Sequence, residues 1–98
     1  MRMMMKISIP IEAGNKAVHD GSAQRILKTS LEALRPEAAY FYTAEEGRTI
    51  LLFIDLKENS DMPSIGDPFF QGLNARVTFT PVMNGQDFQA GMAKLSPR

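Results

Sequence analysis

The run Thr-Ile-Leu-Leu-Phe-Ile-Asp-Leu at residues 49–56 places the strongest condition on the fold of this chain. It is rich in β-branched residues and almost wholly apolar, which predicts a strand. Successive side chains of a strand point to opposite faces of a sheet, so the apolar residues 50–54 require cover on both faces. A chain of 98 residues can build one such core, and we expect a single domain over residues 1–98.

Three other segments have the pattern of strands. Residues 5–11 alternate between apolar and polar side chains, and residues 75–82 do the same. Residues 38–43 are rich in β-formers and lead into the turn sequence Glu45-Glu46-Gly47. This arrangement predicts a hairpin with the strand that follows the turn.

Helical patterns occupy most of the remaining chain. An apolar stripe predicts a helix over residues 22–34, which ends before Pro36. The sequence Ser60-Asp61-Met62-Pro63 predicts the start of a second helix that runs to Leu73. Asp87 is predicted to cap a short last helix.

The order strand, helix, strand, strand, helix, strand predicts a four-stranded antiparallel sheet covered on one face by two helices. This is an α+β fold, the ferredoxin-like βαββαβ plait, here with a C-terminal helix. Strand parity assigns apolar residues to the helix-covered face: Ile7, Ile9, Ile11, Ile50, Leu52, Ile54, Leu56, Val77 and Phe79. It assigns an amphipathic set to the open face: Lys6, Ser8, Leu51, Phe53, Asp55, Arg76, Thr78 and Thr80. Tyr40 and Tyr42 are expected to join this set, because phenolic oxygens favour the wetter side of a sheet.

The open face sets an expectation about assembly. Leu51, Phe53 and two tyrosines in water would form a contiguous apolar patch, which single-chain proteins usually avoid. A second copy of the same sheet, related by a two-fold axis, covers such a face most simply. We therefore expect a homodimer closed by the open face.

Composition disfavours nucleic-acid binding and excludes cysteine-based chemistry. Eleven Lys and Arg balance eleven Asp and Glu, which gives no electrostatic basis for holding a nucleic acid. Without cysteine there is no disulfide framework, thiolate metal site or cysteine nucleophile. No apolar stretch reaches the length of a signal-peptide core or a membrane-spanning helix. We expect a cytoplasmic protein without a cofactor and without a nucleic-acid or membrane partner.

Three stretches carry a resemblance to a known superfamily: Gly14-Asn15, Pro68-Phe69-Phe70 and residues 77–83. Together with the element order, they make the chain resemble the dimeric α+β barrel superfamily, close to its small single-domain bacterial members. The resemblance implies two ferredoxin-like protomers packed sheet against sheet. Branches of the superfamily include cofactor-independent monooxygenases, haem-degrading enzymes and muconolactone-type isomerases. No branch's catalytic set can be placed on this sequence, and the tryptophan typical of the haem-degrading branch is absent.

His19, the one histidine, is the candidate catalytic residue, acting as a general base beside a loop. We expect that loop over residues 13–21, because Val18 lies half a turn off the apolar stripe of the following helix. The same loop holds Asn15, a candidate ligand-binding residue. The structural alternative is an exposed histidine at an irregular helix start. No metal is expected, since a lone histidine lacks partners at ligand spacing.

The remaining ligand-binding candidates lie on the open face: Tyr40, Tyr42, Phe53 and Arg76. The two phenol rings can orient a flat ligand by stacking and hydrogen bonding. The arginine can converge with Lys6 and Asp55 on an anion-holding pocket. The alternatives are packing in a dimer interface for the aromatic rings and a buried charge network for the ions.

Three classes of function stay open at this point. The first is a site for a small apolar or aromatic ligand, with cofactor-free oxygenation or isomerisation as its reaction. The second is a non-catalytic dimer that binds a metabolite or serves as an assembly module. The third is RNA binding, because the RNA-recognition motif has the same topology. Residues 48–55 lack the glycine and aromatic pattern of that motif, so RNA binding ranks last.

Overall fold

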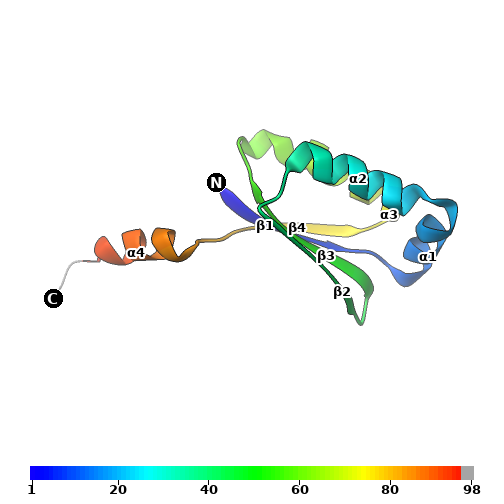
Figure 1. Cartoon of the computed structure of the whole chain (residues 1–98), viewed down its shortest axis with the longest axis horizontal. Coiled ribbons are helices and arrows are strands. Elements are labelled where there is room, and N and C mark those ends of the chain that lie inside the picture. Colours follow the sequence, from blue (N-terminus) through cyan, green and yellow to red (C-terminus); the bar gives the residue numbers. More distant parts are fainter. Residues whose placement is uncertain (96–98) are drawn as a thin grey trace.

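Four antiparallel strands form one sheet in the order β2-β3-β1-β4. The computed structural model describes residues 1–95 (Figure 1). The strands are β1 (Arg2–Ser8), β2 (Ala38–Ala44), β3 (Gly47–Asp55) and β4 (Arg76–Pro81). The helices are α1 (Ile11–Asp20), α2 (Ser22–Leu34), α3 (Met62–Leu73, after a short 3-10 turn at Asn59–Asp61) and α4 (Gly85–Ala93). This α+β architecture confirms the predicted antiparallel sheet and is compatible with the ferredoxin-like plait.

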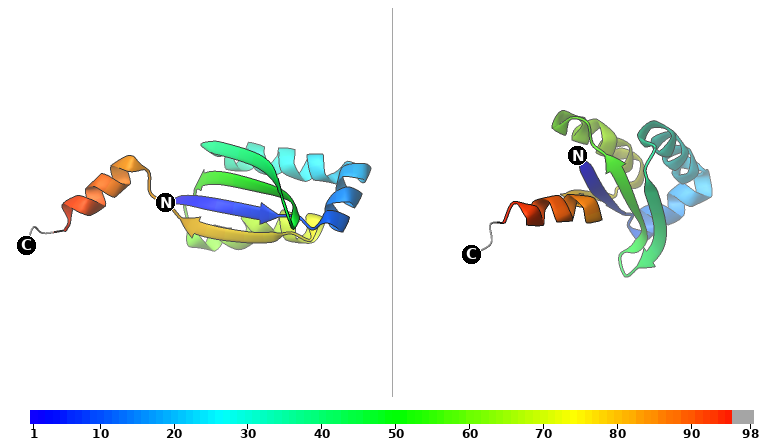
Figure 2. Two further views of the ribbon diagram at one scale, coloured as in Figure 1. Left: turned by 90° about the horizontal axis from the view of Figure 1, so that it is seen from below. Right: turned by 60° about the vertical axis from the view of Figure 1, so that its left-hand side comes forward.

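The helices cover only one face of the sheet. Helices α2 and α3 lie side by side over it, and α1 lies at one end of the layer (Figure 1). The opposite face carries no element of residues 1–95 (Figure 2). Helix α4 projects away from both layers, and the chain extends 59 Å along its longest axis. Within residues 1–95, no helix combines the length and apolarity needed to cross a membrane.

The strand register separates the two faces as strand parity predicts. Residues paired across strands share a face, so Met5 and Leu52 lie under the helices, whereas Lys6 and Leu51 lie on the open face. The core between sheet and helices is built from fully buried side chains: Met5, Ile7, Leu52, Ile54, Phe69 and Leu73. The open face holds Arg2, Met4, Lys6, Ser8, Ala38, Tyr40, Tyr42, Thr49, Leu51, Phe53, Asp55, Arg76, Thr78 and Thr80.

The predicted strand over residues 5–11 runs too far at its C-terminal end, and the predicted loop over residues 13–21 is wrong, because these residues form most of α1. Strand β1 ends at Ser8, and Ile11 begins α1 with 57% of its surface exposed instead of facing the core. Helix α1 buries Gly14 and Ala17, which are too small to form an apolar stripe in the sequence. Gly21, at a φ of 83°, ends α1 and redirects the chain into α2.

The last helix begins differently from the prediction. Asn84, not Asp87, caps α4: its side chain accepts a hydrogen bond from the Asp87 backbone N–H at 2.8 Å. The Asp87 carboxylate in turn accepts from the Asn84 backbone N–H at 3.1 Å. This reciprocal capping box satisfies two amide groups that a helix N-terminus otherwise leaves without partners.

Candidate functional site

The structure places His19 and Asn15 away from the open face of the sheet. Both residues lie on α1 and are exposed, with His19 in the last turn of that helix. The Asn15 side-chain oxygen accepts a hydrogen bond from Arg48 Nη1 at 3.0 Å, which ties α1 to the start of β3. The structure therefore does not bring His19 or Asn15 together with the tyrosines.

Of the three charged residues predicted to converge, Lys6 and Arg76 lie together and Asp55 lies apart from them. Arg76 pairs with Ser8, two positions along β1 from Lys6, so the two cations are neighbours on the open face. Asp55 pairs with Arg2, four positions from Lys6, or roughly 13 Å along the strand. The carboxylate therefore belongs to the opposite end of the sheet.

A cavity of about 640 Å³ lies around the two cations, on the open face beside β1 and β4. It is lined by Lys6, Ser8, Pro10, Glu46, Asn74, Ala75, Arg76 and Thr78. Volumes of this order hold metabolite-sized ligands. Asn74 ends α3 in the left-handed conformation, at a φ of 51°, and so turns the chain from α3 into β4 at the rim of the cavity.

The lining of this cavity favours an anion. Lys6 and Arg76 contribute two positive charges against one carboxylate, that of Glu46. Among residues 1–95, neither cation forms an ion pair. The hydroxyl groups of Ser8 and Thr78 add hydrogen-bond donors on the same face. An arginine fork with a lysine beside it suits a carboxylate or phosphate group.

An aromatic patch borders the cavity on the same face. Leu51 pairs with Lys6 on one side and with Tyr40 on the other, so the patch continues directly from the cations. The Tyr40 and Phe53 rings meet edge to face, with centroids 6.4 Å apart and planes at 84°. Tyr40 keeps 59% of its surface exposed. The structure thus brings Tyr40, Phe53 and Arg76 to one surface.

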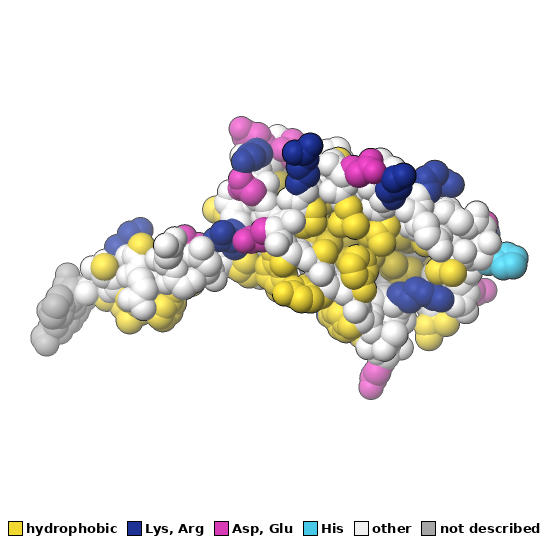
Figure 3. All heavy atoms as spheres, in the orientation of Figure 1, with side chains coloured by type: hydrophobic (Ala, Val, Ile, Leu, Met, Phe, Trp, Pro, Cys, Tyr) yellow, Lys and Arg dark blue, Asp and Glu magenta, His cyan; other side chains and the backbone are white. Residues whose placement is uncertain are grey.

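A second concave surface lies on the other side of the sheet, between α2 and β2. We call it the α2/β2 groove; it measures about 390 Å³. Its apolar lining includes Ile9, Val18, Ala23, Leu27, Phe41 and Ile50. Apolar side chains gather visibly between these two elements in the space-filling view (Figure 3). Phe41, on the edge strand, is 55% exposed, so the groove lacks cover on its outer side.

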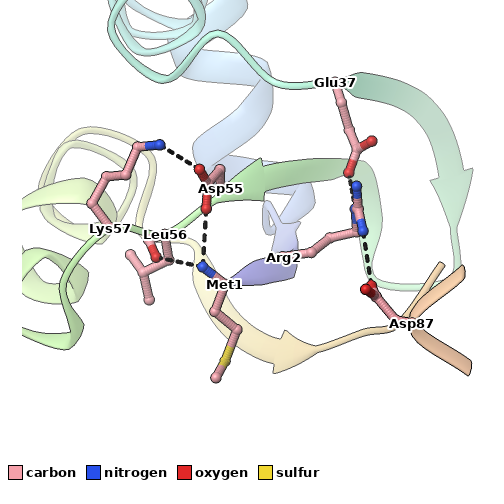
Figure 4. A network of polar contacts seen from close by, with 7 residues as sticks. All are labelled: Met1, Arg2, Glu37, Asp55, Leu56, Lys57 and Asp87. Carbon is pink, nitrogen blue, oxygen red and sulfur yellow. Dashed lines mark hydrogen bonds and ion pairs between the residues drawn. The ribbon is translucent and has the colours of Figure 1, made fainter. Parts of the chain in front are cut away.

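Displaced pKa values occur at exposed ion pairs and turns, away from the cavity. Figure 4 shows the ion pairs of Asp55 and Arg2. The hydrogen bond from Lys57, together with the N-terminal ammonium, lowers the pKa of Asp55 to about 2. The hydrogen bond to Glu37 raises the pKa of Arg2, and hydrogen bonds from Ser22 lower that of Asp20. These shifts have structural causes and give no acid or base poised near neutral pH.

Sequence reasoning missed part of the cavity. Glu46 and Asn74 lie in connections, where strand parity gives no information. Ser8 and Thr78 were placed correctly on the open face, and their register with Arg76 and Lys6 was the available signal. Within residues 1–95, no three His, Asp or Glu residues form a group that could hold a metal ion. Compared with known proteins, the chain matches no family model, no curated protein and no solved structure.

Proposed function

We propose that this protein is a homodimer that binds a small organic anion with a flat apolar part on the open face of its sheet. The observation that carries the proposal is the cavity around Lys6 and Arg76, bordered by the aromatic patch. The two cations would hold a carboxylate, and Tyr40 and Phe53 would contact the apolar part of the ligand. A cytoplasmic location remains a prediction of the sequence.

We propose a second copy because the open face exposes apolar side chains to solvent. Leu51 and Phe53 lie at the centre of the sheet with no element of residues 1–95 over them. Covering them with another open face removes this patch from water and narrows the cavity to a site between two sheets. In that drier site, Lys6 and Arg76 need a counter-charge, which the ligand anion supplies.

We assign binding and no reaction. His19, the candidate general base, lies on α1 and does not line the cavity. Cofactor-free oxygenation or isomerisation, which the superfamily resemblance implies, needs a group that moves a proton beside the substrate. Glu46 is the one carboxylate in the lining, and the two cations beside it favour holding an anion. A non-catalytic ligand-binding dimer fits the observed lining better.

Isothermal titration with benzoate tests the proposed anion site, and benzyl alcohol serves as the neutral analogue of the same shape. We expect benzoate to bind and benzyl alcohol to bind at least about tenfold more weakly. Lys6→Gln and Arg76→Gln should each weaken benzoate binding by roughly tenfold. Lys28→Gln, an exposed change on α2, is the matched control and should leave binding unchanged. Equal affinity for the acid and the alcohol would contradict the proposal.

A further inference from the structure

Helix α4 carries apolar side chains that remain about half exposed. Phe88 and Met92 are four residues apart in α4, which places them on one side of the helix, and Leu95 follows just after the helix ends. Phe88 is 50% and Met92 is 48% exposed. Met83, in the connection before the helix, is exposed as well. We call residues 82–95 the arm.

The arm is held in place by polar contacts at its base. Arg2 Nη1 donates to Asp87 Oδ2 at 3.0 Å, which fixes the first turn of α4 to β1 (Figure 4). The capping box of Asn84 and Asp87 fixes the same turn. The helix therefore points away from its own sheet with its apolar side uncovered (Figure 1).

The α2/β2 groove has the complementary chemistry. Helices that dock in apolar grooves present apolar anchors one turn apart, as Phe88 and Met92 are on α4. The groove has room for the side chains of Phe88 and Met92, and Phe41 and Leu27 form its walls. The open sheet face suits the arm less well, because Lys6 and Arg76 occupy it.

The arm cannot fill the groove of its own chain. β4 and β2 are the two edge strands, roughly 14 Å apart across the sheet. Pro81 is level with Met3, whereas Phe41 of the groove, on β2, is level with Ile50 and Ile7, roughly 13 Å further along the strands. The direct line, about 19 Å, passes through the sheet and its helices.

The backbone from Pro81 to Phe88, the first anchor of the arm, is shorter than this line. Residues 82–84 span at most about 11 Å when extended. Phe88 lies only about 6 Å further along the axis of α4. A path around the layers is longer still, so the first anchor of the arm does not reach the groove of the same chain.

We propose that the arm docks in the α2/β2 groove of a second copy of this chain, and that two copies exchange arms reciprocally. The apolar side of α4 and the α2/β2 groove complement each other but do not meet within one chain. In a pair of chains related by a two-fold axis, each surface contacts its counterpart on the other chain. This proposal shares the second copy with the proposed function and is independent of the ligand. The arm then adds contacts at the edge of the dimer.

Disulfide trapping tests this contact directly, because the chain has no cysteine of its own. One full-length chain carries Met92→Cys and a second, of different tag mass, carries Phe41→Cys; the two are mixed and oxidised. Disulfides form only between nearby residues, so we expect the mixed disulfide at roughly ten times the yield of an Ala90→Cys control. Ala90 lies on the opposite side of α4 from Met92.

Two further variants complete the experiment. Gln24→Cys replaces an exposed polar residue of the groove, so it reports on the contact if Phe41→Cys fails to fold. Thr80→Cys places the thiol on the open face instead. Equal yields for the two α4 positions, or a higher yield with Thr80→Cys than with both groove positions, would overturn the proposal. Benzoate binding is a separate readout, so failure here and failure of the anion site are distinguishable.

Discussion

Arg2 and Asp87, 85 residues apart in the sequence, form an ion pair in which Arg2 Nη1 donates to Asp87 Oδ2 at 3.0 Å. The same guanidinium donates through Nε to the carboxylate of Glu37. Arg2 therefore joins the first strand to the segment before β2 and to the base of α4 (Figure 4). These contacts set the direction in which α4 leaves the sheet.

Asp87→Ala should loosen α4 locally. The substitution removes both the ion pair with Arg2 and the hydrogen bond to the Asn84 amide, so backbone amides of Gly85–Ala93 should exchange faster with solvent. The global free energy of unfolding should fall by no more than about 1 kcal/mol, because the pair is exposed. Asp87→Asn, which can still accept from Asn84, should have a smaller effect. Unchanged exchange in both variants would show that these contacts do not hold the helix.

Gly47→Ala should destabilise the protein strongly. Gly47 begins β3 at a φ of 130°, and an added Cβ would lie 2.5 Å from the backbone oxygen of Ile9. Strain and clash together should lower the free energy of unfolding by roughly 1–3 kcal/mol or more. Gly85→Ala, where an added Cβ meets nothing within 4 Å, should stay within about 0.5 kcal/mol of the parent. Equal melting curves for the two variants would count against the described turn.

Asp55 should make the free energy of unfolding depend on pH in the acid range. Lys57 and the N-terminal ammonium lower its pKa from 3.8 to about 2 in the folded state. A carboxyl with a lowered folded pKa stabilises above its unfolded value, so this contribution is present above pH 4 and lost as the pH falls toward about 2. Carboxyl NMR titration should find the low value and a higher one in Lys57→Gln. An identical midpoint in that variant would remove Lys57 as the cause.

Phe53→Asp should break the proposed sheet-to-sheet dimer. Phe53 lies on the open face at the centre of the sheet, where a buried unpaired charge opposes association by several kcal/mol. Phe70→Asp is the matched control, because Phe70 lies exposed on α3. In sedimentation velocity, the first variant should sediment as a single chain and the second as the parent does. Dissociation of both, or of neither, would place the interface elsewhere.

Most of the features that the sequence predicts correctly follow from strand parity. The alternation of Lys6 with Met5 and Ile7, and of Leu51 with Ile50 and Leu52, identifies the two faces without any tertiary information. Helix α2 was predicted at its observed bounds, since its apolar stripe is wide. Phe53 of the aromatic patch follows from the same parity, and Tyr40 follows from the preference of a phenolic oxygen for the wetter face.

The features that the sequence does not predict depend on contacts that produce no periodic pattern of apolar residues. Helix α1 packs through Gly14 and Ala17, so its buried side carries no large apolar residue and the segment was predicted to be a loop. For the same reason the sequence predicts His19 beside a loop, whereas it lies exposed in the last turn of a helix. Glu46 and Asn74 reach the cavity only through the hairpin turn and the end of α3, which tertiary structure alone brings together.

Native mass spectrometry of the full chain, purified gently from its expression host, tests the proposed function most directly. Our account predicts a species at twice the chain mass of 10.9 kDa that carries a small acidic molecule. The Arg76→Gln protein should keep the dimer mass and lose most of the bound molecule. A chain that stays single and carries no adduct as its concentration rises through the micromolar range would contradict the claim that the open face is a binding interface.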